Sequence, residues 1–190
     1  MTKPIKFKPM RQGQTGFSLL ELLVAVFIFG VLLAIAAPSF IGQRPRQDLK
    51  RLSREIVSDM QFAKVSAIKQ SSTWAIQFYP ATSEYKVLSD DGVDDTWGTA
   101  DDTVFKTVSL STYPGITFGN PSGYPTADGD PIPGDGVSFA NERVLFSRDG
   151  TSVSGAVYIK NDRNDAFAIG STSAAGRIKT WLNFGSGWQS

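Results

Sequence analysis

The chain has 190 residues and a mass of 20.6 kDa, enough for one globular domain and an additional segment. Its 19 Lys and Arg balance 18 Asp and Glu, so the net charge does not indicate a nucleic-acid-binding protein. The sequence contains no Cys and no His, which excludes disulfides, thiolate nucleophiles and the commonest general base, and this counts against an enzyme.

A basic segment and a long apolar segment open the sequence. Residues 1–16 carry several cations and no acid, a bias that keeps a segment on the cytoplasmic side of a membrane. The cations are Lys3, Lys6, Lys8 and Arg11. Residues 17–37 contain only Ser18 and Glu21 as polar side chains, and a helix of this length can cross a bilayer. We therefore expect a cleaved leader over residues 1–16 and a transmembrane and assembly helix over residues 17–38.

An ordinary secretory signal peptide is the alternative for this region. It would end at the small residues Ala34 and Ala36 and release a soluble domain near Ala37. Glu21 argues against it, because a carboxylate in a membrane segment is costly and is normally retained for a partner. The apolar run is also longer than the usual core of a signal peptide.

The string GFSLLE at residues 16–21, followed by an apolar helix, resembles the class III signal of type IV pilins and type II secretion pseudopilins. The resemblance implies that a prepilin peptidase cleaves after Gly16 and that Phe17 becomes the methylated N-terminus. It places Glu21 fifth in the mature chain and a helix-interrupting proline, Pro38, at mature position 38 − 16 = 22. Physically, Glu21 can accept the N-terminal amine of Phe17 in a neighbouring subunit, which makes it an assembly residue rather than a catalytic one.

The next segment, residues 39–70, has the pattern of an amphipathic helix, bent or partly melted between Pro38 and Pro45. Its apolar residues recur at steps of three and four: Leu49, Leu52, Ile56, Met60, Ala63 and Ala67. Residues 71–190 then predict a mainly antiparallel β domain with surface loops at 90–102 and 114–136. The candidate strands are 73–79, 85–88, 104–110, 116–118, 144–147, 156–160, 166–169 and 177–182. The expected fold class is α+β, with the long N-terminal helix packed on this domain.

The C-terminal half is also similar to minor pilins and pseudopilins of the GspH/FimT type. The similarity lies in the strings VLFSRDG at 144–150, GAVYI at 155–159 and GRIK at 176–179. It implies a low-copy component that primes or caps a filament.

The string GRIK resembles the GRxR-like element with which some FimT-type minor pilins contact DNA. Arg177 and Lys179 alternate on a predicted strand, so both cations would lie on one face and could bind phosphates, with Lys160 and Arg163 extending the patch. The alternative is a glycine turn with solvated charges.

An Asp-rich segment at residues 90–102 could hold Ca²⁺, because closely spaced carboxylates suit a hard cation. The carboxylates are Asp90, Asp91, Asp94, Asp95, Asp101 and Asp102. The segment lacks the ligand order of an EF-hand, and the alternative is a solvated, self-repelling loop.

Two functions therefore remain open. The chain is either a subunit of a type IV pilus or a type II secretion pseudopilus, or a DNA-binding module on such a filament. Its expected partners are the prepilin peptidase and other pilins, and its expected location is the inner membrane, with the C-terminal domain periplasmic or extracellular, and then the filament.

Overall fold

The computed structural model describes residues 16–41, 44–127 and 134–190. The chain divides into two units, the first ending at Gly42 and the second spanning Gln43–Ser190. The first unit contains one helix, α1, over Leu19–Ile41. Pro38, the proline predicted to interrupt the helix, lies three residues before the end of α1 at Ile41, and the next helix starts at Arg44. A proline removes one backbone donor and bends a helix, but the turns on either side can persist.

From the apolar segment, we expected a transmembrane helix over residues 17–38. Among the described residues, no helix has the length and apolar character needed to cross a membrane.

The second unit begins with helix α2, Arg44–Gln70, which is amphipathic as the sequence predicted. The stripe of apolar residues from Leu49 to Ala67 is fully buried, and the opposite face of the helix is exposed. Lys69 lies in the last turn of the helix, where a cation is favourable beside the free carbonyl groups.

In the described residues after α2, eight strands form two four-stranded antiparallel sheets. The first sheet has the order β3-β2-β1-β5 and the second has the order β4-β6-β7-β8. The strands are β1 Trp74–Tyr79, β2 Glu84–Asp90, β3 Thr103–Ser109, β4 Ile116–Phe118, β5 Arg143–Phe146, β6 Gly155–Asn161, β7 Ala166–Ser171 and β8 Ile178–Asn183. Single 3₁₀ turns lie at Pro80–Thr82, Leu110–Thr112 and Ala140–Glu142. The eight strands match the eight predicted segments to within a few residues.

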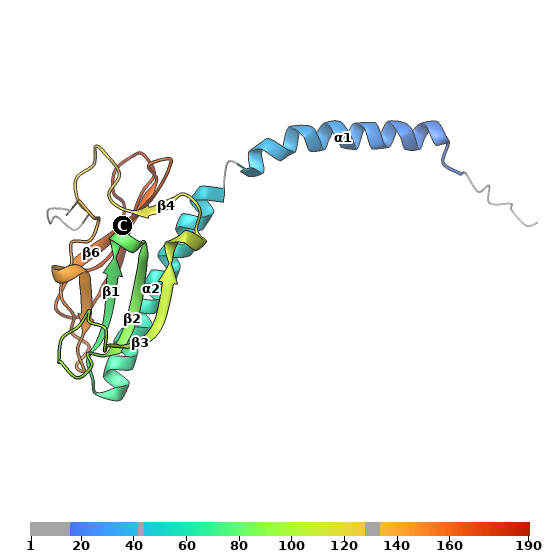
Figure 1. Cartoon of the computed structure of the whole chain (residues 1–190). Helices are drawn as coiled ribbons and strands as arrows, with labels where there is room; N and C mark the ends of the chain where they lie inside the picture. The colour runs from blue at the N-terminus through green and yellow to red at the C-terminus, as the bar shows by residue number, and fades with distance from the viewer. Residues whose placement is uncertain (1–15, 42–43, 128–133) are drawn as a thin grey trace, which may run out of the picture. The chain divides into compact units, whose positions relative to one another are not determined.

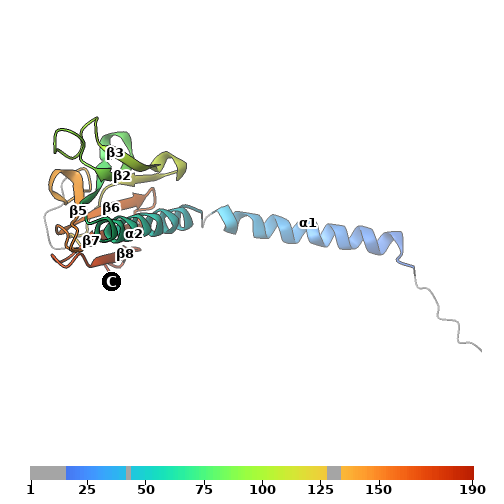
Figure 2. The ribbon, with the colours of Figure 1, turned by 90° about the horizontal axis from the view of Figure 1, so that it is seen from below.

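Helix α2 packs against strands of both sheets, and most of all against β7 and β1. Figure 1 shows β1, β2 and β3 running beside α2, and Figure 2 shows β2 and β3 on one side of this helix and β8 on the other. One large core joins the buried stripe of α2 to both sheets. This arrangement confirms the predicted α+β class, with the helix packed on antiparallel sheets.

The outer face of the second sheet has a smaller core of its own, made by Ala156, Tyr158, Ala168 and Trp181. Part of the Pro- and Gly-rich loop and the C-terminal tail cover it. The Tyr158 hydroxyl accepts a hydrogen bond from the Ala127 amide at 3.0 Å, and the Trp188 indole donates to the Pro125 carbonyl at 2.7 Å.

Candidate functional site

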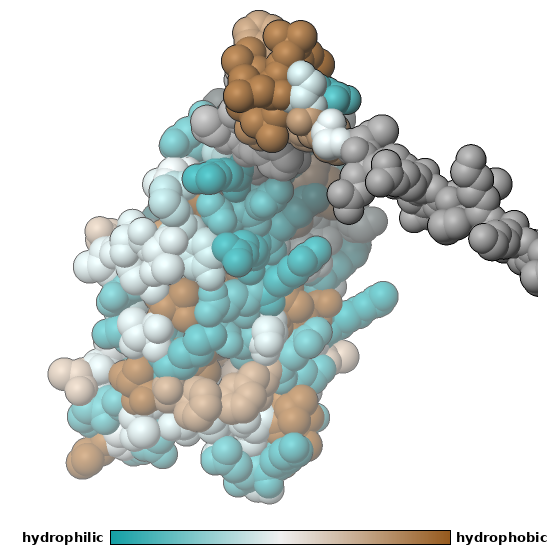
Figure 3. Space-filling view, turned by 90° about the vertical axis from the view of Figure 1, so that its right-hand side faces the viewer, coloured by the Kyte–Doolittle hydropathy of each residue, from teal (hydrophilic) through white to brown (hydrophobic). Residues whose placement is uncertain are grey.

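Over residues 19–34, helix α1 exposes its side chains on every face. From Phe17, which is 82% exposed, to Leu33, each large apolar side chain of this segment is largely accessible to solvent. Figure 3 shows these side chains as a compact brown group, whereas the visible face of the second unit is mainly hydrophilic. A helix that is apolar all round needs lipid or protein around it. The α1 surface is therefore a candidate assembly surface.

Gly16, Phe17 and Ser18 precede α1 in extended chain, and Glu21 lies in its first turn. The Leu22 amide donates to the Ser18 carbonyl at 3.1 Å, which makes Ser18 the residue that starts the helix. A carboxylate in the first turn is stabilised by the helix dipole, and Ser18 and Glu21 have the spacing of a capping box. Among the described residues, no cation lies within ion-pair distance of Glu21.

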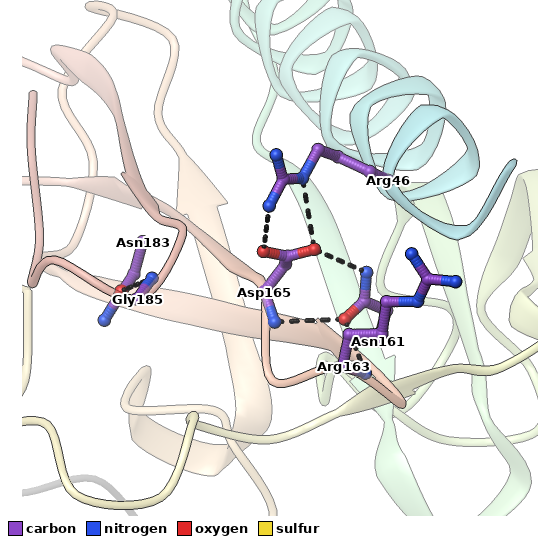
Figure 4. A network of polar contacts seen from close by, with 6 residues as sticks. All are labelled: Arg46, Asn161, Arg163, Asp165, Asn183 and Gly185. Carbon is purple, nitrogen blue, oxygen red and sulfur yellow. Dashed lines mark hydrogen bonds and ion pairs between the residues drawn. The ribbon is translucent and has the colours of Figure 1, made fainter. Parts of the chain in front are cut away.

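A first polar network fixes the start of α2 to the turn between β6 and β7 (Figure 4). Arg46 donates two hydrogen bonds to Asp165, at 2.7 Å and 3.2 Å, and Asn161 donates a third at 3.2 Å. Asp165 is only 6% exposed. Burial alone would raise the pKa of Asp165, but the bonds from Arg46 and Asn161 outweigh it and hold the pKa below its usual value.

A second network joins the middle of α2 to the edge of the first sheet. The Lys106 ammonium of β3 lies 2.8 Å from Asp59 and 3.0 Å from Glu55, and the Tyr85 hydroxyl donates to Asp59 at 2.7 Å. Burial would raise the pKa of Glu55, but hydrogen bonds from Tyr113 and Lys106 hold it below its usual value. The hydrogen bond that Tyr113 donates to Glu55 raises the pKa of the tyrosine to about 12. Both networks are structural, since each ties α2 to a sheet.

The two cations of the GRIK string lie at the start of β8. Arg177 is exposed just before the strand, and the Lys179 ammonium lies 5.2 Å from the centre of the Trp181 ring. Within the described residues, neither cation takes part in an ion pair. The expected extension of this patch is wrong: Lys160 pairs with Ala166, which faces Asn183 at the far end of β8. The cation that does lie near is Lys64 of α2, which donates to the carbonyls of Ala175 and Gly176 at 3.0 Å and 2.9 Å.

Gly176 itself is needed for close packing. Its φ is +64°, and a side chain there would lie 2.4 Å from the Gly150 carbonyl oxygen. The turn before β8 and the turn after β5 are therefore in contact, and the Ser152 amide donates to the Ala174 carbonyl at 3.0 Å. The turn at Gly176 therefore serves to pack these two turns together, and this role does not depend on a ligand at the neighbouring cations.

The Asp-rich loop between β2 and β3 is held by its own carboxylates. Asp101 accepts hydrogen bonds from the amides of Val93 and Asp94, and Asp102 accepts one from Gly98. The hydrogen bond from Thr99 and the backbone bonds lower the pKa of Asp101. Across the described ranges, which include this whole loop, no three acidic side chains gather into a set that could hold a metal ion. The arrangement gives the calcium prediction no support.

Comparison with protein families adds two matches. The model of the prokaryotic N-terminal methylation motif matches residues 11–37, and the model of the type II transport protein GspH matches residues 52–176, more than half of the chain. This chain belongs to the GspH family. The predicted resemblance to type IV pilin-like proteins and pseudopilins is thereby confirmed.

Individual relatives of this GspH-family chain are also components of type II secretion systems. The type II secretion system core protein G of Klebsiella michiganensis is 35% identical over 48 residues, 25% of this chain and 34% of that protein. The protein of the same name in Vibrio cholerae is 39% identical over 51 residues, 27% and 34% of the two chains. The chain therefore spans about a third of the length of these relatives.

Among solved structures, the type IV minor pilin FimU of Pseudomonas aeruginosa resembles this GspH-family chain with a TM-score of 0.50. The identity is 15%, and the match covers 76% of this chain and 94% of FimU, which shows a common fold. The family and this neighbour are pilin-like proteins, in agreement with the prediction that the chain is not an enzyme.

Sequence reasoning missed the residues that fix α2 to the sheets. Arg46 and Asp165 are 119 positions apart, and Lys106 lies 47 positions from Asp59. The charged positions of α2 resemble an ordinary solvated helix face, and Asp165 stands in a turn-rich segment. Of the acidic residues on α2, only Asp59 could have been predicted to be buried. It lies three residues after Ile56, on the same face of the helix as the apolar stripe.

Proposed function

We propose that the chain is made as a precursor, cleaved after Gly16 by a prepilin peptidase, methylated on Phe17, and assembled through α1 into a filament with other pilin-like subunits. The observation that carries the proposal is α1 itself, an apolar surface exposed on all faces whose one charge, Glu21, is the fifth residue after Gly16. Copies of α1 packed together would bury this surface, and the methylation-motif match over residues 11–37 supports the processing step.

Before assembly, the chain would be held at the inner membrane by its N-terminal segment, with the second unit outside the cytoplasm. The basic residues ahead of Gly16 support this orientation. After assembly, it would be part of a pseudopilus of a type II secretion system or of a type IV pilus, and the GspH-family match supports the former. A role at the tip or in priming fits the likeness to a minor pilin.

Glu21 has two roles to separate. It can stabilise the start of its own helix, or it can accept the amine of Phe17 from a neighbouring subunit. Glu21→Gln distinguishes them, because an amide can still serve in a capping box but carries no charge to pair with the amine.

The experiment is made on the chain in its native cell, with the N-terminus determined by mass spectrometry and filaments collected by shearing. The wild-type chain should begin at methylated Phe17. Gly16→Leu should block cleavage, whereas Gly30→Leu, a matched change within α1, should leave it intact. Glu21→Gln and Glu21→Ala should both be cleaved and both be depleted from filaments by about tenfold or more. Normal incorporation of Glu21→Gln would refute the ion pair, and a wild-type start near Ala37 would refute the processing.

A DNA-binding role at the filament surface is the second candidate. The exposed Arg177 and Lys179, two residues further on, favour it, because two cations at the start of one strand can contact phosphate groups. Residues 44–190 should then bind DNA with an affinity that falls as salt rises, and Arg177→Ala with Lys179→Ala should weaken binding. Lys160→Ala, at the far end of the second sheet from Arg177, is a control for general charge. Absence of binding at low salt would end this candidate.

A further inference from the structure

The first three turns of α2 carry a dense group of cations. Residues 44–54 contain five cations and a single acid. The cations are Arg44, Arg46, Lys50, Arg51 and Arg54, and all five residues are exposed. We call these five residues the basic cluster of α2.

Much of the charge of the basic cluster is left unneutralised. Arg46 is bound to Asp165, and Arg51 lies 3.7 Å from Asp48, the one acid within residues 44–54. Within the described residues, the other three cations of the cluster form no ion pair. Glu55, the next acid along the helix, is already bound by a lysine and a tyrosine of other elements. Three unpaired cations therefore face the solvent together.

The position of the basic cluster is unfavourable for α2 itself. The N-terminal end of a helix is the positive end of its dipole, which favours acids in the first turn and repels cations. Helix α2 has no acid in its first turn, where Arg44 and Arg46 stand. Lys50 and Arg54 are four residues apart, a spacing at which like charges on a helix repel each other. Cations that are retained against both repulsions indicate a negatively charged partner.

The basic cluster follows the apolar segment directly along the chain. Only residues 42 and 43 separate the end of α1 at Ile41 from Arg44. Three extended residues span at most about 11 Å, so the backbone of Arg44 cannot lie farther than this from the end of α1. If α1 is held in the inner membrane, the first turn of α2 must begin close to the lipid headgroups.

The residue types of the cluster suit phosphate groups. Four of its five cations are Arg, and the planar guanidinium group of Arg binds phosphate through paired hydrogen bonds. Groups of Lys and Arg directly beside a membrane segment are attracted to anionic lipids. An acidic protein surface is the other partner that the charge allows, but the continuity of the cluster with α1 favours the membrane.

We propose that, before assembly, the basic cluster of α2 binds the phosphate groups of anionic lipids at the outer surface of the inner membrane. Helix α1 supplies the apolar anchor, and the cluster adds an electrostatic contact beside it. The contact is given up when the chain leaves the membrane for the filament. The inference rests on the proposed function, because it needs a chain that is held in the inner membrane before assembly.

The test uses the full chain, which has no cysteine of its own. Gln47→Cys lies within the cluster and Gln70→Cys lies at the other end of α2, and each is labelled with the same fluorophore. At 1.5 Å per residue, the two labels are about 35 Å apart along the helix. Each chain is reconstituted in vesicles of phosphatidylcholine alone and in vesicles with about 30% phosphatidylglycerol, both with a quencher on the lipid headgroups.

Quenching at position 47 should be at least about twofold stronger in the anionic vesicles, and the difference should vanish in about 1 M NaCl because salt screens the contact. Quenching at position 70 should not depend on the lipid. Equal quenching at position 47 in both kinds of vesicle overturns the proposal. A release by inorganic phosphate that exceeds the release by NaCl of the same ionic strength would assign the cations to free phosphate, and it overturns the membrane contact as well.

Removal of charge provides the second measurement. The combined change Arg44→Gln, Lys50→Gln and Arg54→Gln removes the three unpaired cations of the cluster and should lower quenching at position 47 to the level in phosphatidylcholine. The control removes three cations elsewhere, by Lys69→Gln, Lys160→Gln and Lys179→Gln, and should leave the quenching unchanged. An equal loss in both variants overturns a specific role for the cluster.

Flotation of the chain with the vesicles separates this inference from the proposed function. A chain that floats with both kinds of vesicle but shows equal quenching at position 47 overturns the lipid contact alone. A chain that floats with neither kind is not held by its N-terminal segment, and this result overturns the membrane stage of the proposed function together with the inference.

Discussion

The most informative single residue of the second unit is Asp165, a buried carboxylate that keeps its charge. Taking a carboxylate out of water is costly, and three hydrogen bonds from Arg46 and Asn161 offset that cost. Because the bonds hold the pKa of Asp165 below its usual value of 3.8, this stabilisation is present above about pH 4 and is lost as the pH falls through the lowered pKa.

Arg46→Ala should therefore lower the free energy of unfolding by about 2 kcal/mol at pH 7, because it leaves a buried carboxylate short of its partner. The loss should shrink as the pH falls through the lowered pKa of Asp165, because the protonated carboxyl no longer needs the charge of Arg46. Urea unfolding of residues 44–190 at several pH values measures this. Arg51→Ala is the matched control, since its 3.7 Å pair with Asp48 is more exposed and should cost less than about 1 kcal/mol. Equal losses at pH 7 and pH 2 would contradict the assignment.

Among the secondary-structure elements, the edge strand β3 is tied to α2 by a charged side chain, Lys106. It is an edge strand that pairs only with β2, and its Lys106 reaches the carboxylates of Glu55 and Asp59 on α2. Burial would lower the pKa of Lys106, but the two carboxylates raise it, so the lysine stays charged throughout the physiological range. The edge strand is in this way fastened to the helix as well as to its neighbouring strand.

Lys106→Met should destabilise the unit by about 2 kcal/mol, because Asp59 is then left buried with only the Tyr85 hydroxyl as a donor. The effect should be local, with the amides of β3 exchanging hydrogen faster and those of β1 unchanged. Hydrogen–deuterium exchange by NMR would show it. Lys86→Met on β2, whose pair with Glu84 is longer at 3.7 Å, should leave β3 protected. Faster exchange in both variants would contradict a specific role for Lys106.

The elements themselves could be predicted, and their pairing could not. Leu49, Leu52, Ile56 and Met60 predict α2 because a helical period is a local property of the sequence. The strands follow from short β-type runs between turn residues in the same way. The order β3-β2-β1-β5, by contrast, brings residues 74 and 146 together, and such register depends on how the whole core packs. For the site, the string at residues 16–21 was sufficient to indicate the family, while the networks of Arg46 with Asp165 and of Lys106 with Asp59 depend on tertiary structure.

At the scale of the whole molecule, the two units differ in how they expose their apolar side chains. Every large apolar side chain described in α1 up to Leu33 is exposed, whereas the second unit buries a core shared by α2 and both sheets. The second unit has the means to be stable alone, and α1 does not.

A chain beginning at Phe17 should therefore associate into large species in water without detergent, while a chain beginning at Arg44 should sediment as a monomer at micromolar concentration. The physical reason is the apolar area of α1, which only detergent or other copies can cover. Analytical ultracentrifugation of both chains checks the expectation. A monomeric chain beginning at Phe17 in the absence of detergent would show that α1 finds cover within its own molecule.

The two networks along α2 also have a mechanical consequence. Tension that reaches the second unit through the chain before Arg44 enters at the first turn of α2, where Arg46 is bound to the second sheet, and then meets Glu55 and Asp59, bound to the first. A pull along the helix axis would have to slide α2 past the two sheets. The apolar core and both groups of ion pairs would therefore have to break at the same time. In single-molecule pulling experiments, the second unit of Arg46→Ala and of Lys106→Met should each unfold at a lower force than the second unit of the wild-type chain.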